Sequence, residues 1–501
     1  MPSVLGRAAE LLGARRNSEA LALLTAHEDA GRADAQYCTA RAKAHRALGQ
    51  MAEAARWYDA ALSHQPHTSA ALHGRARVAL QRGEAEALQR FDAALAVNPG
   101  DADLWLGKAQ ALDVAGDSKG ARLIAQQLCD QAPGFIAALE FLAGLNLAQG
   151  VVDFAAPFAV ATLKAPQDPN IAAAHVDALA GIDRAAEAAA VAAEARRRFP
   201  ALTHFALLEA VHAGSAGEWE RAEAIFAALP KETPQRALHE ARHRIRSGEI
   251  RRACALLDTA LTESPWDIAA WAMAGIVWRL SDEERHRAKA EWLHGQPGLI
   301  QFRPLSARAG LIKDVTAELG RLHQRSGMPL GQSLRGGTQT RGILFQRTEL
   351  LLAELHDAIR ATLEEYRADL PPLDEAHPLL RHRDAPWQLA GSWSVRLTGA
   401  GDHHAAHIHP QGLISSALYL VVPGEVDEAG HPGCLEIGRP KADLCTDLAP
   451  LRIIKPEPGH LALFPSTAYH GTTPFRAAER MTVAFDVVCD EVKESEPTPN
   501  P

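Results

Sequence analysis

The chain has 501 residues, which fits roughly two to four domains or a long repeat array joined to another domain. Apolar residues form 47% of it and charged residues 23%, values that exclude intrinsic disorder as the overall class. A net charge of −9 argues against nucleic acid or an anionic membrane as a partner, because both require a basic surface. No stretch of about 20 apolar residues could span a bilayer, and six scattered cysteines fit a reducing compartment. We therefore expect a cytoplasmic protein that binds neither nucleic acid nor membranes.

Up to about residue 290 the sequence is rich in strong helix formers, and its helix breakers are periodic. Prolines recur at positions 66, 99, 133, 166, 200, 234 and 265, and glycines at 49, 83, 116, 150, 181, 217 and 248. Between these markers Ala54, Tyr58 and Ala61 stand at i, i+4 and i+7, and the same spacing returns at Ala87 and Ala222. Such residues share one helix face. We expect the glycine to end the first helix of each pair and the proline to follow the second.

A helix–turn–helix unit of 34 residues with these positions resembles the tetratricopeptide repeat. The resemblance covers roughly residues 1–290 and implies an all-α superhelix with a concave face, which we place at 1–295. Its groove is predicted to capture a peptide or protein. The alternatives are a spacer or a surface for homo-oligomerisation.

From residue 301 the composition changes. The segment QFRPLSARAG (301–310) is predicted to be a linker or the last cap of the array, and two helices follow at 308–325 and 347–368. The glycine-rich segment 331–342 between them indicates an ordered loop or a strand edge. Alternating patterns predict strands at 392–397, 413–422, 434–437, 452–456, 460–464 and 481–488. Short strands at this spacing suggest a sandwich or barrel; we place this domain at 296–490 and a disordered tail at 491–501.

Four histidines lie in the segment GDHHAAHIHP (401–410). His407 and His409 are two residues apart, so on a strand both imidazoles point to the same face and can reach one metal ion. His470 follows the apolar strand HLALF and is a third candidate ligand. Arg480, ten residues later, offers a planar fork for a carboxylate, and Thr482 on the same strand face can add a hydroxyl donor.

The region 331–488 resembles the double-stranded β-helix (jelly-roll) oxygenases that depend on Fe(II) and 2-oxoglutarate, and looks closest to a bacterial and phage branch. The matching segments are SLRGGTQT (333–340), HIHP with the following LISSALYLVVP, PEPGHLALFPS, and His470 followed by Arg480. The resemblance implies that His407 and His470 bind iron. It also implies that Arg480 binds the far carboxylate of 2-oxoglutarate.

One position departs from the superfamily, where an acidic residue stands in place of His409. Three interpretations are open. His409 is the third ligand, or His407 and His470 hold the iron alone, or the metal is not iron. We prefer the first, since the HxH pair is typical of this branch.

Other polar residues are candidates for the same cavity. Tyr419 is predicted to hydrogen-bond the co-substrate or to be an ordinary sheet aromatic. Arg396, which faces either the barrel interior or the outside, and Arg335 in the glycine-rich loop are candidates for substrate contact. His403 and His404 are predicted to lie in a surface loop.

The sequence therefore predicts a tetratricopeptide superhelix carrying a jelly-roll dioxygenase that hydroxylates a side chain of a captured peptide or protein. Two alternatives remain at this stage. The first is a non-catalytic scaffold with a degenerate jelly roll. The second is a small-molecule oxygenase whose repeats serve assembly.

Overall fold

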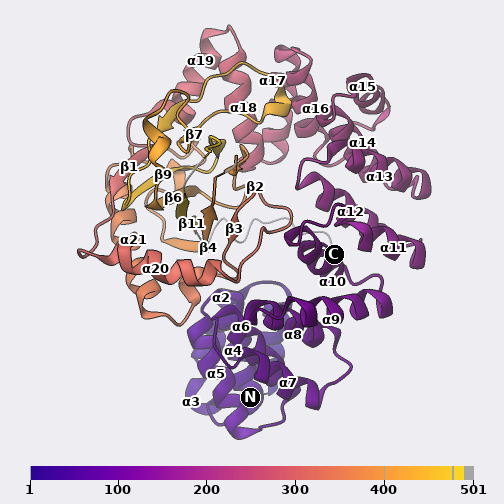
Figure 1. Cartoon of the computed structure of the whole chain (residues 1–501), viewed down its shortest axis with the longest axis vertical. Coiled ribbons are helices and arrows are strands. Elements are labelled where there is room, and N and C mark those ends of the chain that lie inside the picture. Colours follow the sequence, from indigo (N-terminus) through magenta and orange to yellow (C-terminus); the bar gives the residue numbers. More distant parts are fainter. Residues whose placement is uncertain (1, 400, 477–478, 490–501) are drawn as a thin grey trace.

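The computed structural model of the chain describes residues 2–399, 401–476 and 479–489, and the tail predicted at 491–501 lies outside them. It consists of an all-α tetratricopeptide superhelix followed by a jelly roll with supporting helices, as the sequence predicts (Figure 1). The boundary between residues 295 and 296 stays a prediction; the helical segment η1 (Glu291–Gly295) ends at Gly295 and the first strand begins at Gln301.

Apart from the four-residue helix at 28–31, consecutive helices of the array pack against each other. Their bounds are α1 (Pro2–Gly13), α2 (Asn17–Thr25), α3 (Glu28–Gly31), α4 (Ala35–Ala47), α5 (Met51–His64), α6 (Ser69–Gln81), α7 (Ala87–Val97), α8 (Ala102–Ala115), α9 (Ser118–Gln131), α10 (Ile136–Ala148), α11 (Ala156–Lys164), α12 (Pro169–Ala180), α13 (Ala185–Arg198), α14 (Thr203–Ser215), α15 (Trp219–Ala228), α16 (Arg236–Arg246), α17 (Ile250–Glu263), α18 (Ile268–Leu280) and α19 (Glu284–Ala290). None of the helices in the described part of the chain has the length and apolar character that crossing a membrane requires.

The periodic aromatic residues lock one repeat onto the next. Tyr58 of α5 and Phe91 of α7 are buried. A Cβ at Gly74 would lie 2.1 Å from the ring of Tyr58, and one at Gly107 would lie 2.2 Å from the ring of Phe91. In these two repeats the second helix therefore packs its aromatic side chain against a glycine of the following repeat.

Gly181 departs from the other periodic glycines. Gly49, Gly83 and their equivalents have positive φ and end the first helix of a pair, but Gly181 has a φ of −62°. Its missing side chain serves another purpose, because a Cβ there would lie 2.5 Å from Cα of Gly331 in the C-terminal part. The glycine at this repeat permits a close backbone contact between the two parts of the chain.

The strands form two facing antiparallel sheets and a small ribbon. The larger sheet has the order β1-β9-β6-β11-β4-β3, the smaller one β10-β7-β8, and β2 pairs with β5. The bounds are β1 (Gln301–Pro304), β2 (Leu334–Arg335), β3 (Thr338–Gln339), β4 (Trp387–Leu397), β5 (His403–His404), β6 (Ile414–Val421), β7 (Leu435–Ile437), β8 (Arg452–Ile454), β9 (His460–Pro465), β10 (His470–Thr472) and β11 (Arg480–Cys489). The supporting helices are α20 (Leu311–His323) and α21 (Leu350–Ala368), with short turns η2 (Leu344–Gln346), η3 (Leu380–His382), η4 (Gly424–Asp427) and η5 (Ala442–Leu444).

Strand alternation divides the larger sheet into two faces. Met481, Val483, Phe485 and Val487 pack with α20 and α21 in the main core. The intervening residues of β11 face the space between the sheets, where Tyr419 and Phe464 pack against the smaller sheet. Arg480, Thr482 and Asp486 are thereby directed to the interior of the jelly roll.

Two local predictions were wrong. Residues 301–304 form strand β1 rather than a linker, because they pair with β9 far along the chain. His403 and His404 form strand β5 rather than a surface loop, because Arg335 and Leu334 pair with them.

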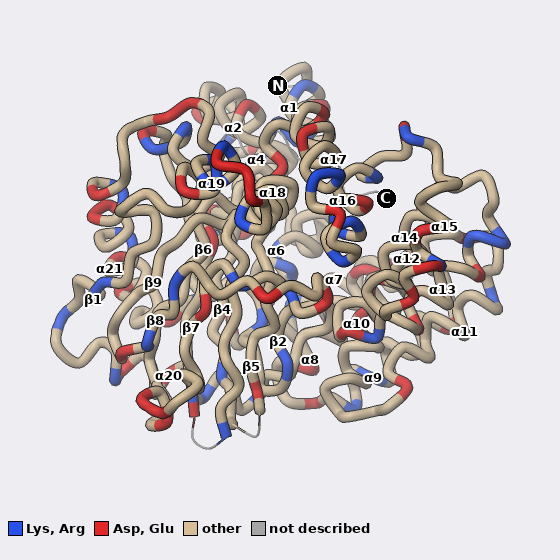
Figure 2. Tube along the Cα trace, turned by 90° about the horizontal axis from the view of Figure 1, so that it is seen from above, with Lys and Arg blue, Asp and Glu red and all other residues tan. Residues whose placement is uncertain are grey.

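The array curves around the jelly roll and touches it near both ends (Figure 1). Toward its start, the backbone N–H of Met51 donates to Gln346, 3.2 Å away. Toward its end, Arg242 and Arg246 of α16 pair with Asp443 in η5. Figure 2 shows acidic and basic residues interspersed over both parts of the chain rather than gathered by sign.

Candidate metal centre

Backbone pairing brings His407 and His470 together. Each donates its N–H to the carbonyl of the other at 2.9 Å, which forms an isolated antiparallel bridge at the start of β10. Residues paired in this way direct their side chains to the same face, and the two imidazole rings lie 4.2 Å apart. His409, two residues after His407, follows on the same side, with its ring 5.0 Å from that of His470.

The Nε2 atoms of all three histidines are directed toward one common point. The Nδ1 of His407 donates to the carbonyl of Ala405 at 2.8 Å, and that of His470 donates to the carbonyl of Ala468 at 3.2 Å. The Nδ1 of His409 contacts the carboxylate of Asp486. These oxygens accept hydrogen bonds from Nδ1–H, so Nε2 of each neutral ring carries a free lone pair. One ligand atom from each of the three side chains lies within 4.8 Å of the others.

This arrangement fits a metal ion. The Nε2 atoms of His407 and His409 are 3.1 Å apart with two lone pairs facing each other. Imidazole nitrogens bind first-row metals at about 2.0–2.1 Å, so adjacent ligands of one ion lie about 3 Å apart. Burial, followed by the neighbouring histidines, holds the pKa of His407 and of His470 well below the usual value, which favours the neutral form that binds metals.

A buried cation without an anion lies nearby. Arg480 is 2% exposed, its Nε has no hydrogen-bond partner, and no carboxylate among the described residues pairs with it. The hydroxyl of Tyr419 is also buried without a partner, and its ring lies 5.2 Å from the guanidinium carbon. Burial raises the pKa of Tyr419 to about 12 and lowers the pKa of Arg480. Thr482 pairs across the strands with Tyr419 and shares its face, so these three side chains can receive a carboxylate group.

His404 connects this cation to the histidine cluster. Its ring stacks on that of His407 at 5.8 Å. Burial, then the neighbouring Arg480, lowers the pKa of His404 to about 3. The main chain of β5 can approach because residue 471 is a glycine: a Cβ there would lie 2.9 Å from the carbonyl oxygen of His404.

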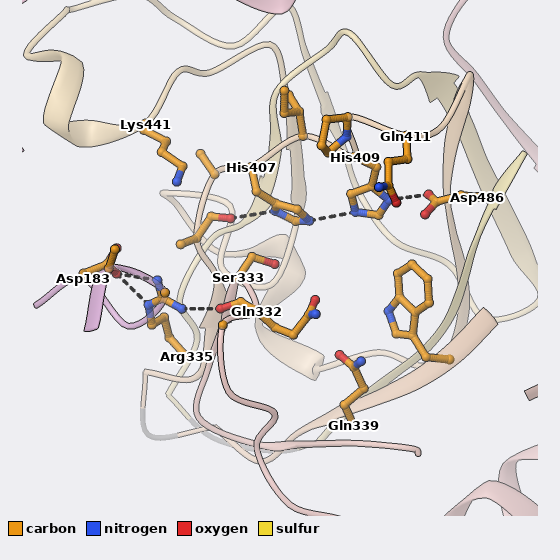
Figure 3. A pocket seen from close by; sticks show the side chains of 18 residues that line it. Asp183, Gln332, Ser333, Arg335, Gln339, His407, His409, Gln411, Lys441 and Asp486 are labelled. Carbon is orange, nitrogen blue, oxygen red and sulfur yellow. Dashed lines mark hydrogen bonds and ion pairs between the residues drawn. The ribbon is translucent and has the colours of Figure 1, made fainter. Parts of the chain in front are cut away.

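A cavity of about 430 Å³ opens beside the cluster (Figure 3). His407, His409, Trp393 and Gln339 line one part of it, and Lys441 projects toward it from the loop after β7. The tetratricopeptide array supplies the rest of the wall through Ala180, Gly181 and Asp183. Arg335 also lines the cavity and pairs with Asp183 through Nε at 2.7 Å. The cavity is therefore built by both parts of the chain.

The structure gathers the predicted site residues in two sets and places two arginines apart from them. His407, His409 and His470 come together, and Arg480, Thr482 and Tyr419 lie together deeper in the jelly roll, outside the lining of the 430 Å³ cavity. Arg335 lies at the cavity and contacts the array. Arg396 alternates with Trp393 on β4, faces away from the cavity, and is held by Glu479 through two 3.0 Å contacts.

Sequence reasoning missed Asp486, Lys441 and the contribution of Asp183. Asp486 carried a signal, since it is the one acid within the apolar strand MTVAFDVV. The other two depend on contacts between the loop after β7, the glycine-rich loop and the array, for which the sequence has no local marker.

A larger cavity of about 1090 Å³ lies between the array and the jelly roll. Helices α6, α8 and α10 line it on one side, and residues 321–330 and 339–342 line it on the other. Gln339 belongs to the walls of both cavities, and Leu330 of the larger one is followed directly by Gly331 of the smaller one.

Residues 391–486 match the model of a family described as "Putative 2OG-Fe(II) oxygenase". Among solved structures, a tetratricopeptide repeat protein from Parabacteroides merdae aligns with 58% of this chain and 97% of its own, at 14% identity and a TM-score of 0.31. A thermophilic TPR protein from Thermus thermophilus aligns with 35% of this chain and 96% of its own, at 22% identity and a TM-score of 0.30. No curated protein matches the sequence.

The chain therefore combines a tetratricopeptide superhelix with a C-terminal jelly roll, and residues 391–486 of the latter match the oxygenase family model.

Proposed function

We propose that this protein is an Fe(II)- and 2-oxoglutarate-dependent oxygenase that hydroxylates a side chain of a peptide or protein held by the repeat array. The observation that carries the proposal is the pair of unsatisfied groups in one jelly roll. Three imidazoles direct free Nε2 lone pairs to one point, and a buried guanidinium lacks an anion. Burying either group without a partner is unfavourable, so both arrangements are expected to be completed by ligands.

Each residue has a defined task in this proposal. His407, His409 and His470 hold Fe(II). Arg480 binds the far carboxylate of 2-oxoglutarate, assisted by the hydroxyl groups of Thr482 and Tyr419. Arg396, predicted as a substrate contact, is not assigned a role because it is paired with Glu479 outside the cavity.

The iron with its co-substrate supplies the oxidising chemistry, in which dioxygen, 2-oxoglutarate and a C–H bond become succinate, carbon dioxide and a C–OH group. The protein orients the co-substrate through Arg480 and holds the imidazoles in the Nδ1–H form. The apolar residues around Tyr419 and Phe464 exclude water from the carboxylate site. This strengthens its ionic contacts, because the local dielectric constant is low.

The two adjoining cavities support a peptide as the substrate. The larger one offers apolar side chains together with the carboxamides of Gln81, Gln110 and Gln324, which can both donate to and accept from a peptide backbone. Through Gln339 it adjoins the cavity at the histidines. A peptide lying along the array can thus direct one side chain to the metal centre.

The test of the site is anaerobic titration of the full chain with Fe(II) and 2-oxoglutarate, followed by the weak visible charge-transfer band of the chelate. We expect the band in the wild type and its loss in His470→Ala and Arg480→Ala. Absence of both the band and bound metal would refute the oxygenase function and favour a tetratricopeptide scaffold.

The test of the substrate class is succinate formation in the presence of a synthetic peptide library. Ala115→Trp fills the larger cavity from α8, and Ala227→Trp on the exposed side of α15 is the matched control. We expect Ala115→Trp alone to reduce the stimulation by peptides while the charge-transfer band stays unchanged. Equal stimulation in both variants would refute the larger cavity as the peptide site, and the absence of stimulation by any peptide would favour a small-molecule substrate.

A further inference from the structure

Asp486 occupies an unusual position on β11. It is the one acidic residue of this strand, beside a register shift in the pairing with β4 whose extra residue, Gly391, belongs to β4. Strand β11 therefore keeps its alternation, and the carboxylate reaches Nδ1 of His409 (Figure 3). Within the described residues it has no other ion pair, so holding His409 is its one polar contact.

The three histidines differ in what holds them. Ala405 and Ala468 hold His407 and His470 with neutral carbonyl oxygens, whereas Asp486 holds His409 with a carboxylate. Three neutral imidazoles bring no negative charge to a divalent ion. The carboxylate behind His409 is the nearest source of that charge, one side chain further from the metal.

We propose that Asp486 is a positioning residue of the metal centre, which fixes His409 with Nε2 toward the ion and supplies the negative charge that a histidine ligand lacks. This inference rests on the proposed function. In related oxygenases, as the sequence resemblance implies, an acid at the position of His409 would bring the charge directly. In this chain the acid, Asp486, contacts the ligand His409 instead of the metal and acts through its imidazole. The reason is that an Nδ1–H that donates to a carboxylate raises the basicity of the ligating Nε2.

The test is the dissociation constant of Fe(II) alone for the full chain, measured anaerobically by competition with a chromogenic chelator. Asp486→Asn keeps the size and the acceptor oxygen of the side chain but removes its charge. Losing such a partner weakens metal binding by about 10- to 100-fold, and we expect a change of that size together with a higher midpoint potential of the bound iron.

Asp183→Asn is the matched control. It also removes the charge of an aspartate in the wall of the same cavity, but Asp183 contacts Arg335 instead of a histidine. It should change the dissociation constant less than twofold.

A second pair of variants separates charge supply from simple folding. His409→Asp places a carboxylate at the ligand position but sets it against Asp486, so Fe(II) binding should be weaker than in the double variant His409→Asp with Asp486→Asn. The effect of Asp486→Asn thus changes sign with the residue at position 409, which no loss of stability would produce.

The outcomes are distinct. If the wild type binds Fe(II) and Asp486→Asn binds it equally well, or if the substitution is harmful in both backgrounds, the role of Asp486 is wrong while the proposed function stands. If the wild type binds no Fe(II), both are wrong.

Discussion

Replacing Arg480 with Met should have opposite effects on stability and on co-substrate binding. The guanidinium is 2% exposed and has no anionic partner within the described residues, while its stem packs in the jelly-roll interior. Methionine fills a similar unbranched volume and carries no charge. The substitution therefore removes a buried cation that costs free energy in the absence of 2-oxoglutarate, and it removes the group proposed to bind the co-substrate.

The magnitude follows from two opposing terms. Effective desolvation of one buried ion costs several kcal/mol, and the contact of Arg480 with the ring of Tyr419, at 5.2 Å, returns about 2 kcal/mol. The variant without ligand should therefore be more stable by about 1–2 kcal/mol. At about 2–4 °C for each kcal/mol, its melting temperature should rise by a few degrees. Loss of one partner of a buried pair costs about 3–5 kcal/mol, so the dissociation constant of 2-oxoglutarate should rise at least about 100-fold.

Thermal unfolding without co-substrate and calorimetric titration with 2-oxoglutarate, in the presence of Fe(II), measure the two effects. The control is Arg396→Met on β4, whose side chain is 32% exposed and paired with Glu479. An exposed pair contributes about 0.2–1 kcal/mol, so this variant should melt slightly lower and bind 2-oxoglutarate normally. A lower melting temperature of Arg480→Met with unchanged affinity would refute the reasoning.

Three further predictions concern the array and its contact with the jelly roll. Gly107→Ala should lower the free energy of unfolding in urea by about 1–2 kcal/mol, because a Cβ there would lie 2.2 Å from the ring of Phe91, whereas Gly6→Ala in α1 meets nothing within 4 Å and should raise it by up to about 1 kcal/mol. Asp443→Asn should cost about 2–3 kcal/mol, since it leaves two arginines of α16 without their anion. Burial would raise the pKa of Asp443, but these arginines lower it overall, so its contribution is present above about pH 4 and is lost on acidification through the lowered pKa. Of the six cysteines, Cys445 alone is exposed, so one thiol per chain should react rapidly with Ellman's reagent before unfolding and the other five after it.

The array could be predicted from the sequence because its determinants are local. Tyr58 and Phe91 each meet a glycine of the next repeat, and each proline follows the end of a helix, so similar contacts return about every 34 residues. The exception shows the limit of this reasoning. Gly181 fits the period, but its function is to admit Gly331 from the C-terminal part, a contact that no local pattern indicates.

The strands were predicted where a run was long enough to show alternation. Strands β4, β6 and β11 show it, and the short β7 and β8 were predicted from brief apolar runs between turn residues. Strands β1, β5 and β10 have four residues or fewer, were not predicted, and exist through pairing with distant partners. The histidine cluster was predicted because two of its members are two residues apart. The contact of His409 with Asp486 was not predicted, because the two residues are 77 positions apart in the sequence.

The sequence also could not reveal that the repeat array forms part of the wall at the proposed metal centre. Arg335 and Asp183 are 152 positions apart, and each is unremarkable in its own segment. Their contact places the turn between α12 and α13 at the edge of the cavity lined by His407 and His409. Leu444 and Tyr469 of the jelly roll share an apolar cluster with α17 and α18, so the same surface is fixed at a second point. Because the turn that closes the cavity belongs to the element proposed to hold the substrate, a change in the curvature of the array also changes the shape of the cavity. Substrate selection by the array and access to the metal centre are therefore expected to be coupled rather than separable properties of two domains.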